Sequence, residues 1–142
     1  ACELAQNRFS SHKTSTLASL RDHFLHLVSD RISGVEVFGD LENTLPNTLN
    51  LGFEGVEGDT LLIALDMAGL AVSTGSACSS GAGLPSPVLT AMGIPTNKIN
   101  SSIRFSLGFS TTMSEVEKSA EILVRTVSLN RRSTYTERTI KT

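Results

Sequence analysis

The sequence has no tryptophan, one tyrosine and only two cysteines, and it contains no long apolar segment. Two cysteines cannot build a multi-bridge framework, and no Cys-x-x-Cys motif or cluster of cysteine and histidine indicates zinc. No apolar run approaches the roughly 20 residues of a transmembrane helix. The first residues lack the basic and apolar regions of a secretory signal peptide. The sequence therefore favours a protein of a reducing, cytoplasmic compartment.

A marked excess of either charge is also missing. Twelve basic and 14 acidic residues give a net charge of −2, and the basic residues form no block. Electrostatics therefore give no reason to expect nucleic-acid or anionic-membrane binding. A chain of 142 residues is long enough for one domain with a real core. We expect that domain over residues 1–130 and a polar, flexible tail over residues 131–142.

Helical signatures occur in four places. The apolar residues of segment 15–29 recur at helical spacing, and Arg21 falls outside this stripe. Ser86 before Pro87 is typical of a helix N-terminus, and Thr112 with Glu115 has the spacing of a capping box. The helices are expected over residues 15–29, 61–67 and 88–92, and from residue 112 to the tail.

Short segments with strand character alternate with these helices. They are expected over residues 35–38, 48–53, 70–72 and 103–107, with 70–72 as a buried strand. The strands are few and the connections are short. We therefore predict an α+β fold with helices packed on a small, mostly antiparallel sheet.

Cys78 is the first candidate for chemistry. Cysteine is usually a small buried hydrophobic residue. Cys78, however, lies in the segment STGSACSSGAG, which contains no large side chain to bury it and has the composition of a mobile loop. No lysine, arginine or histidine lies within ten residues to lower the pKa of its thiol. A catalytic or redox role and an inert thiol both remain open, and so does a disulfide with Cys2.

Arg104 is the second candidate. It lies between Ile103 and Phe105, and strand alternation places it on the opposite face from these neighbours. One interpretation is a solvated arginine on an exposed face. The other is a planar guanidinium that binds a substrate carboxylate through two charge-assisted hydrogen bonds.

Three histidines and one lysine near the N-terminus suggest chemistry less strongly. His12, His23 and His26 offer no third ligand, so we expect no metal. Lys13 follows Ser11 and His12 in a pattern that suggests a Schiff-base lysine, but a polar segment that enters the first helix explains these residues more simply.

Four segments together carry a resemblance to a known family: LPNTLNLGFEGVEGDTLLIALD, AVSTGSACSSG, PSPVLTAMGI and SSIRFSLG. In this order and spacing they resemble the C-terminal region of the cysteine desulfurases, which are pyridoxal-phosphate enzymes of aminotransferase class V. The resemblance covers residues 17–128, and GSAC matches the subclass with a long mobile loop. It implies that the fold is the C-terminal small domain of a fold-type I pyridoxal-phosphate enzyme.

The resemblance also implies an activity. Cys78 would be the nucleophile that takes sulfur from L-cysteine as a persulfide, with release of L-alanine, and passes it to an acceptor or an iron–sulfur scaffold protein. Arg104 would bind the substrate carboxylate. The intact enzyme would be a homodimer.

The cofactor lysine of the family belongs to an N-terminal domain that nothing in this sequence matches. Lys13 lies too close to Cys78 to be that lysine, so we expect no cofactor-binding residue in this chain and no activity from the chain alone. Two alternatives remain: a stand-alone persulfide relay, and the small domain of a selenocysteine lyase-like enzyme.

Overall fold

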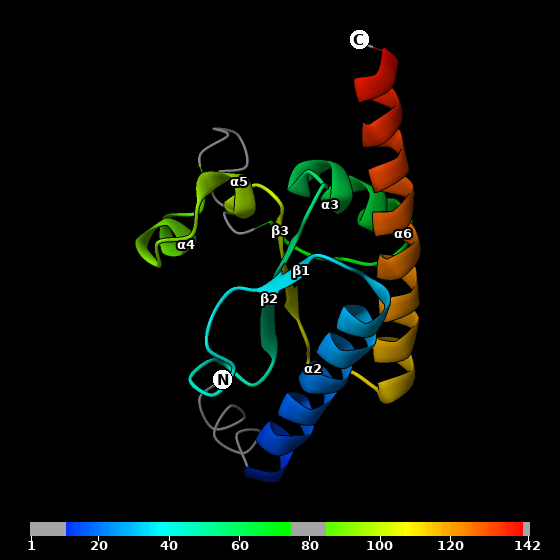
Figure 1. Cartoon of the computed structure of the whole chain (residues 1–142). Coiled ribbons are helices and arrows are strands. Elements are labelled where there is room, and N and C mark those ends of the chain that lie inside the picture. Colours follow the sequence, from blue (N-terminus) through cyan, green and yellow to red (C-terminus); the bar gives the residue numbers. More distant parts are fainter. Residues whose placement is uncertain (1–10, 75–84, 141–142) are drawn as a thin grey trace.

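The computed structural model describes residues 11–74 and 85–140, with the side chains of residues 15–74 and 85–132. Within these ranges a three-stranded sheet is combined with helices, which confirms the predicted α+β class (Figure 1). In chain order the elements are α2 (Ser11–Arg31), β1 (Val35–Val37), β2 (Thr48–Phe53), α3 (Gly58–Met67), α4 (Pro87–Ala91), α5 (Thr96–Ile99), β3 (Ser102–Ser106) and α6 (Met113–Ile140).

The sheet has the strand order β1–β2–β3, and both pairs are antiparallel. In the register of the central strand, Leu51 lies opposite Val37 on one side and Ile103 on the other. Apolar residues alternate along β2, so that Leu49, Leu51 and Phe53 are all buried. One face of the sheet is therefore the floor of the hydrophobic core.

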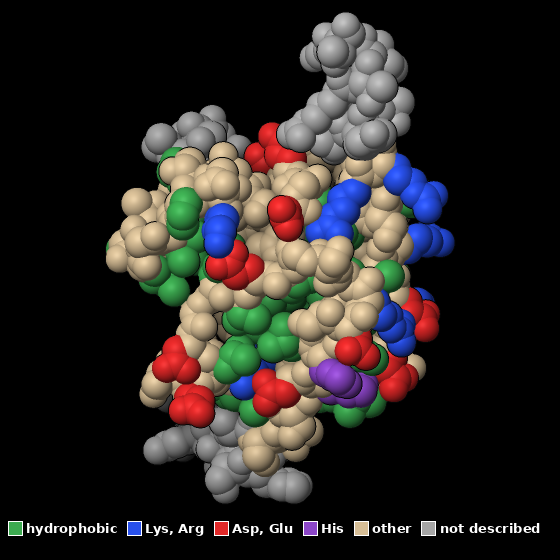
Figure 2. Space-filling view, in the orientation of Figure 1, with side chains coloured by type: hydrophobic (Ala, Val, Ile, Leu, Met, Phe, Trp, Pro, Cys, Tyr) green, Lys and Arg blue, Asp and Glu red, His purple; other side chains and the backbone are tan. Residues whose placement is uncertain are grey.

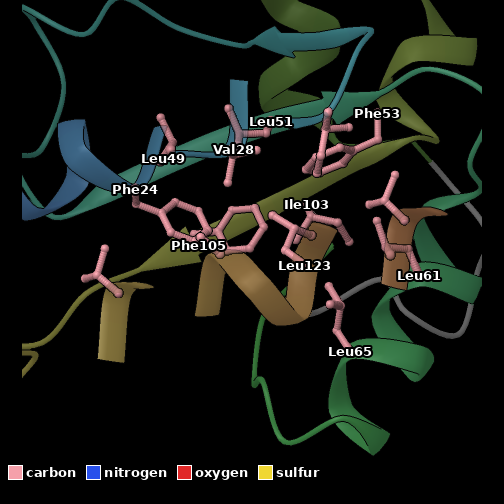
Figure 3. Close-up of a cluster of buried hydrophobic side chains, with 14 of the residues drawn as sticks. Phe24, Val28, Leu49, Leu51, Phe53, Leu61, Leu65, Ile103, Phe105 and Leu123 are labelled. Atoms are coloured by element: carbon pink, nitrogen blue, oxygen red, sulfur yellow. The ribbon is translucent and has the colours of Figure 1, made fainter. Parts of the chain in front are cut away.

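Helices α2, α3 and α6 cover this face. α2 contacts α6, and α6 contacts α3 (Figure 1). Phe24 from α2 packs against Phe105 from β3, with ring centroids 5.0 Å apart, and Leu123 from α6 is fully buried (Figure 3). The apolar stripe predicted for segment 15–29 thus forms one wall of the core.

Arg21 departs from the predicted pattern, because its side chain is buried although it lies outside the apolar stripe. Its guanidinium bonds to the Asp22 carboxylate at 2.8 Å and donates to the Leu45 carbonyl at 3.4 Å. The hydrogen bond to Leu45 connects α2 to the loop that precedes β2. The Asp22 carboxylate compensates the charge of the buried guanidinium, and both partners accept its hydrogen bonds.

The chain from Leu70 to Val72 is not the buried strand that the sequence predicted. The Leu70 N–H still donates to the Leu65 carbonyl at the end of α3, and Ala71 is exposed. Only Ser73 reaches the sheet, through an isolated bridge to Arg104. The Leu70 N–H caps the end of α3 and so is not available to pair with a strand. Only two residues then remain before Ser73, which is too few for a continuous strand pairing with β3.

The predicted helix starts are confirmed at two positions. The Ser86 hydroxyl accepts from the Leu89 N–H at the head of α4. At the head of α6, Glu115 accepts from the Thr112 N–H at 2.8 Å while Thr112 accepts from the Glu115 N–H at 3.3 Å. This reciprocal pair is a capping box.

α6 continues to Ile140, so most of the segment predicted to be a flexible tail is helical. Its last turns extend beyond the rest of the fold (Figure 1). No glycine or proline follows Gly108, and nothing in the sequence therefore stops the helix. The domain boundary at residue 130 stays a prediction. Neither α2 nor α6, the two long helices of the described chain, is apolar enough to cross a membrane.

Candidate functional site

The second face of the sheet carries the polar residues of the strands. Arg104 is half-buried there, whereas its neighbours Ile103 and Phe105 are buried in the core. Asn50 on β2 lies directly opposite Arg104 in the antiparallel register. The strand alternation predicted for Arg104 is therefore present, and it separates this side chain from the core.

A small apolar cluster covers one part of this second face. It consists of Phe38, Leu89 and Ile99, with Ile94 packed against it, and it joins α4 and α5 to the sheet. The Phe38 ring lies so close to Gly52 that a Cβ atom there would come within 2.5 Å of the ring. The glycine is thus required for close packing, and the cluster leaves Arg104 and Asn50 outside it.

Backbone hydrogen bonds fix the chain beside Arg104. On the edge of β3 away from β2, the Arg104 N–H donates to the Ser73 carbonyl at 2.7 Å, and the Ser73 N–H donates to the Arg104 carbonyl at 3.1 Å. The Ser73 hydroxyl donates to the Thr74 carbonyl. Both backbone groups of Arg104 are therefore hydrogen-bonded on this edge of β3, while the strand pairs with β2 along its other edge. The backbone from which the Arg104 side chain projects is thereby fixed.

The guanidinium of Arg104 is free to bind a ligand as far as the described residues go, since none of them forms a hydrogen bond or ion pair with it. Two buried polar atoms lie on the same face, the Asn50 Oδ1 and the Ser102 Oγ, and neither has a hydrogen-bond partner in the described part of the chain. An arginine with two charge-assisted donors to offer suits a carboxylate or a phosphate.

Cys78 and Cys2 both lie outside the described residues. The described chain ends at Thr74, directly after the residue that pairs with Arg104, and resumes at Pro85, directly before the N-cap of α4. The segment that contains Cys78 therefore begins beside Arg104. The resemblance assigns both residues to one reaction, but nothing in the spacing of Cys78 and Arg104 signals that Ser73 bridges to β3.

The lysines with described side chains do not provide a site for a Schiff-base cofactor next to Arg104. Lys98 forms an ion pair with Glu36 at 2.7 Å, and Lys118 is exposed on α6. The side chain of Lys13 lies outside the described residues. Among the described side chains, no lysine amine that could form a Schiff base therefore lies next to Arg104.

No group of three or more metal-binding side chains occurs among the described side chains, those of residues 15–74 and 85–132. A broad open depression of about 880 Å³ is lined by residues of β1, α5 and the loop after β2, among them Glu36, Glu54 and Lys98. Arg104 does not line it. The depression is therefore separate from the candidate site.

Comparisons with known proteins give a consistent result. The family model "Aminotransferase class-V" matches residues 4–118. The chain is 44% identical over 111 residues to a cysteine desulfurase IscS of Dictyoglomus turgidum, covering 78% of this chain and 28% of that protein. It is 39% identical over 111 residues to the cysteine desulfurase NifS of Azotobacter vinelandii, covering 78% of this chain and 28% of that protein.

Among solved structures, a NifS-like protein aligns with a TM-score of 0.75 at 28% identity, covering 89% of this chain and 31% of that one. A NifS-like protein from Rickettsia africae aligns with a TM-score of 0.72 at 24% identity, over 88% of this chain and 31% of that one. The chain thus spans about three tenths of the length of the proteins that it matches.

Proposed function

The chain belongs to the aminotransferase class V family, and on this basis we propose that it is the C-terminal part of a cysteine desulfurase. The intact enzyme depends on pyridoxal phosphate and removes sulfur from L-cysteine. The names of its relatives support the substrate and the reaction. The destination of the sulfur in this proposal is an acceptor protein or an iron–sulfur scaffold protein.

One observation carries this proposal: Ser73 pairs with Arg104 through two backbone hydrogen bonds. Cys78 follows Ser73 by five residues. Five residues of chain span at most about 18 Å. This reach allows the Cys78 thiol and the Arg104 guanidinium to belong to one site for a small amino acid.

Arg104 binds the substrate in this proposal. Its planar guanidinium donates two parallel hydrogen bonds to the carboxylate of L-cysteine. The strand holds the backbone of the arginine, so the carboxylate is bound at a defined position and the sulfur is oriented away from it. Pyridoxal phosphate supplies an electron sink when bound, and its lysine belongs to a part of the enzyme outside these residues.

Cys78 accepts the sulfur. Its thiolate forms an S–S bond to the sulfur of L-cysteine while the carbon–sulfur bond breaks, and the bonding pair stays with the carbon. A proton on that carbon completes L-alanine, and Cys78 is left as a persulfide. Transfer of the outer sulfur to a thiol acceptor restores Cys78. The cytoplasm, where thiols stay reduced, suits this cycle.

The experiment that tests this function detects sulfur on Cys78. The complete enzyme, with its cofactor domain, is incubated with L-cysteine and analysed by mass spectrometry after digestion. We expect one added sulfur atom on the peptide that contains Cys78, and none after Cys78→Ala. The matched control is Cys2→Ala, which should retain the adduct. An adduct that persists in Cys78→Ala would refute the assignment.

A further inference from the structure

Asn50 lies on the same face of the sheet as Arg104 and has no assigned role. It occupies the central strand, directly opposite Arg104 in the ladder. Its Oδ1 is buried and has no hydrogen-bond partner among the described residues. Because a buried carbonyl oxygen without a donor costs free energy, an asparagine at this position needs a reason other than stability.

The ladder brings the two side chains together. Residues directly opposite in an antiparallel pair have their Cβ atoms about 5 Å apart, on the same face. The Asn50 backbone carbonyl accepts from the Phe38 N–H at 2.9 Å, so Asn50 is fixed from the β1 side as well. An arginine has five donors in a rigid plane. A carboxylate that is bound by two of them leaves others for a neighbouring acceptor.

Ser102 also has a buried oxygen without a partner, but its position is different. It lies opposite Gly52, which the Phe38 ring covers. Ser102 therefore belongs to the part of the face that is closed by the apolar cluster. Asn50 is the orphaned polar residue that directly faces Arg104 in the register.

We propose that Asn50 is a positioning residue for the substrate carboxylate site: its Oδ1 accepts a hydrogen bond from the Arg104 guanidinium in the substrate-bound enzyme and fixes the plane of the guanidinium. This inference rests on the proposed function, because it assumes that Arg104 binds the carboxylate. Asn50 does not touch the substrate. It acts through Arg104, and so it contributes to binding in the ground state and the transition state alike.

The test measures the kinetics of the complete enzyme with L-cysteine, by release of alanine. Asn50→Leu removes the acceptor at similar size. We expect KM to rise about tenfold, as for loss of one hydrogen bond to a charged group, with kcat nearly unchanged. Thr48→Val is the matched control, since Thr48 lies on the same strand and the same face but opposite Ser106. It should leave both constants unchanged.

A second variant keeps the shape of the side chain. Asn50→Asp retains an oxygen acceptor but adds a negative charge beside the guanidinium. The new carboxylate competes with the carboxylate of the substrate for Arg104, so KM should rise further than in Asn50→Leu. A thermal melt of each variant checks that it folds. Because this second replacement is isosteric, the test does not depend on whether the leucine variant folds.

A double-mutant cycle separates positioning from a general structural role. In an Arg104→Ala background, Asn50→Leu should have no further effect on KM, because the group through which it acts is gone. An equal effect with and without Arg104 would overturn the inference, and so would an unchanged KM in Asn50→Leu. If Arg104→Ala itself leaves KM unchanged, the carboxylate site fails first. That result would contradict the role of Arg104 in the proposed function, and not only the role of Asn50.

Discussion

The burial of its two neighbours in the strand determines which face of the sheet Arg104 occupies. Ile103 and Phe105 are buried on the core face, and this fixes the arginine on the other face. The Arg104 side chain is half-buried there, so bulk water surrounds it only in part. The surroundings lower the cost of ordering the side chain and strengthen a charge-assisted hydrogen bond to a carboxylate.

Replacement of Arg104 tests its role directly. Arg104→Ala should raise KM for L-cysteine about 10- to 100-fold with a smaller change in kcat, because two charge-assisted hydrogen bonds to the carboxylate are lost. Arg104→Lys should fall between the wild type and the alanine variant, since it keeps the charge without the planar fork. Steady-state kinetics of the complete enzyme measures both.

The control is Arg125→Ala, which removes an exposed arginine from α6 without touching the sheet. It should leave KM unchanged. An equally small effect of Arg104→Ala would favour the alternative of a solvated surface arginine.

At the scale of the element, α6 is stabilised where it begins. Glu115 accepts from both the N–H and the hydroxyl of Thr112, at 2.8 Å and 2.9 Å. The Thr112 backbone N–H, and then its hydroxyl, lower the pKa of Glu115 below its ordinary value. The negative charge also lies at the positive end of the helix dipole. The ionised carboxylate is therefore the form that the folded state prefers.

The pH dependence of stability follows from this direction. Because the pKa is lower in the folded chain, Glu115 stabilises the fold above its unfolded pKa of about 4.3. The contribution disappears as the pH falls through the folded pKa. Glu115→Gln should lower the melting temperature at neutral pH, and the difference from the wild type should shrink at about pH 3. Thermal melts over this range measure it.

Glu121→Gln is the matched control. Glu121 is exposed in the middle of the same helix and so has no free helix N–H group to accept from. Its replacement should have little effect at either pH. A pH-independent difference for Glu115→Gln would contradict the capping contribution of the charge.

At the scale of the whole molecule, stability and chemistry use opposite faces of one small sheet. The core of α2, α3 and α6 packs on one face (Figures 1 and 3). The strand register and the burial of the neighbouring residues place Arg104 and Asn50 on the other face. In the orientation of Figure 2, hydrophobic side chains are visible near the centre and are surrounded by charged ones. Because the two faces are separate, we expect substitutions at Arg104 or Asn50 to have little effect on the packing of the core.

The lysines of this chain lead to a prediction about its activity when it is produced alone. We expect the 142-residue chain to lack desulfurase activity, because none of its described lysines faces Arg104. Mixed with pyridoxal phosphate, it should show no absorbance band of a lysine-bound cofactor and release no alanine from L-cysteine. The complete enzyme assayed in parallel is the positive control. A band that Lys13→Ala abolishes would falsify this expectation.

The sequence by itself determined most of the local structure. The spacing of apolar residues predicted the helices near both ends, and Ser86, Thr112 and Glu115 predicted helix starts that are present. These signals are local, because a cap or an amphipathic stripe depends on residues within a few positions. The α5 helix of four residues escaped prediction, since so short an element has almost no periodicity.

Only the tertiary structure decided which residues meet. Leu70–Val72 had the composition of a strand, but the end of α3 uses its first donor and Ser73 alone reaches β3. Arg21 had the charge of a surface residue, but a loop carbonyl and Asp22 allow its burial. The pairing of Arg104 with Asn50 and Ser73 depends on strand register. The alternation of apolar residues limits the register of a strand. Which strand it pairs with depends on contacts between segments distant in sequence, and local composition does not specify these contacts.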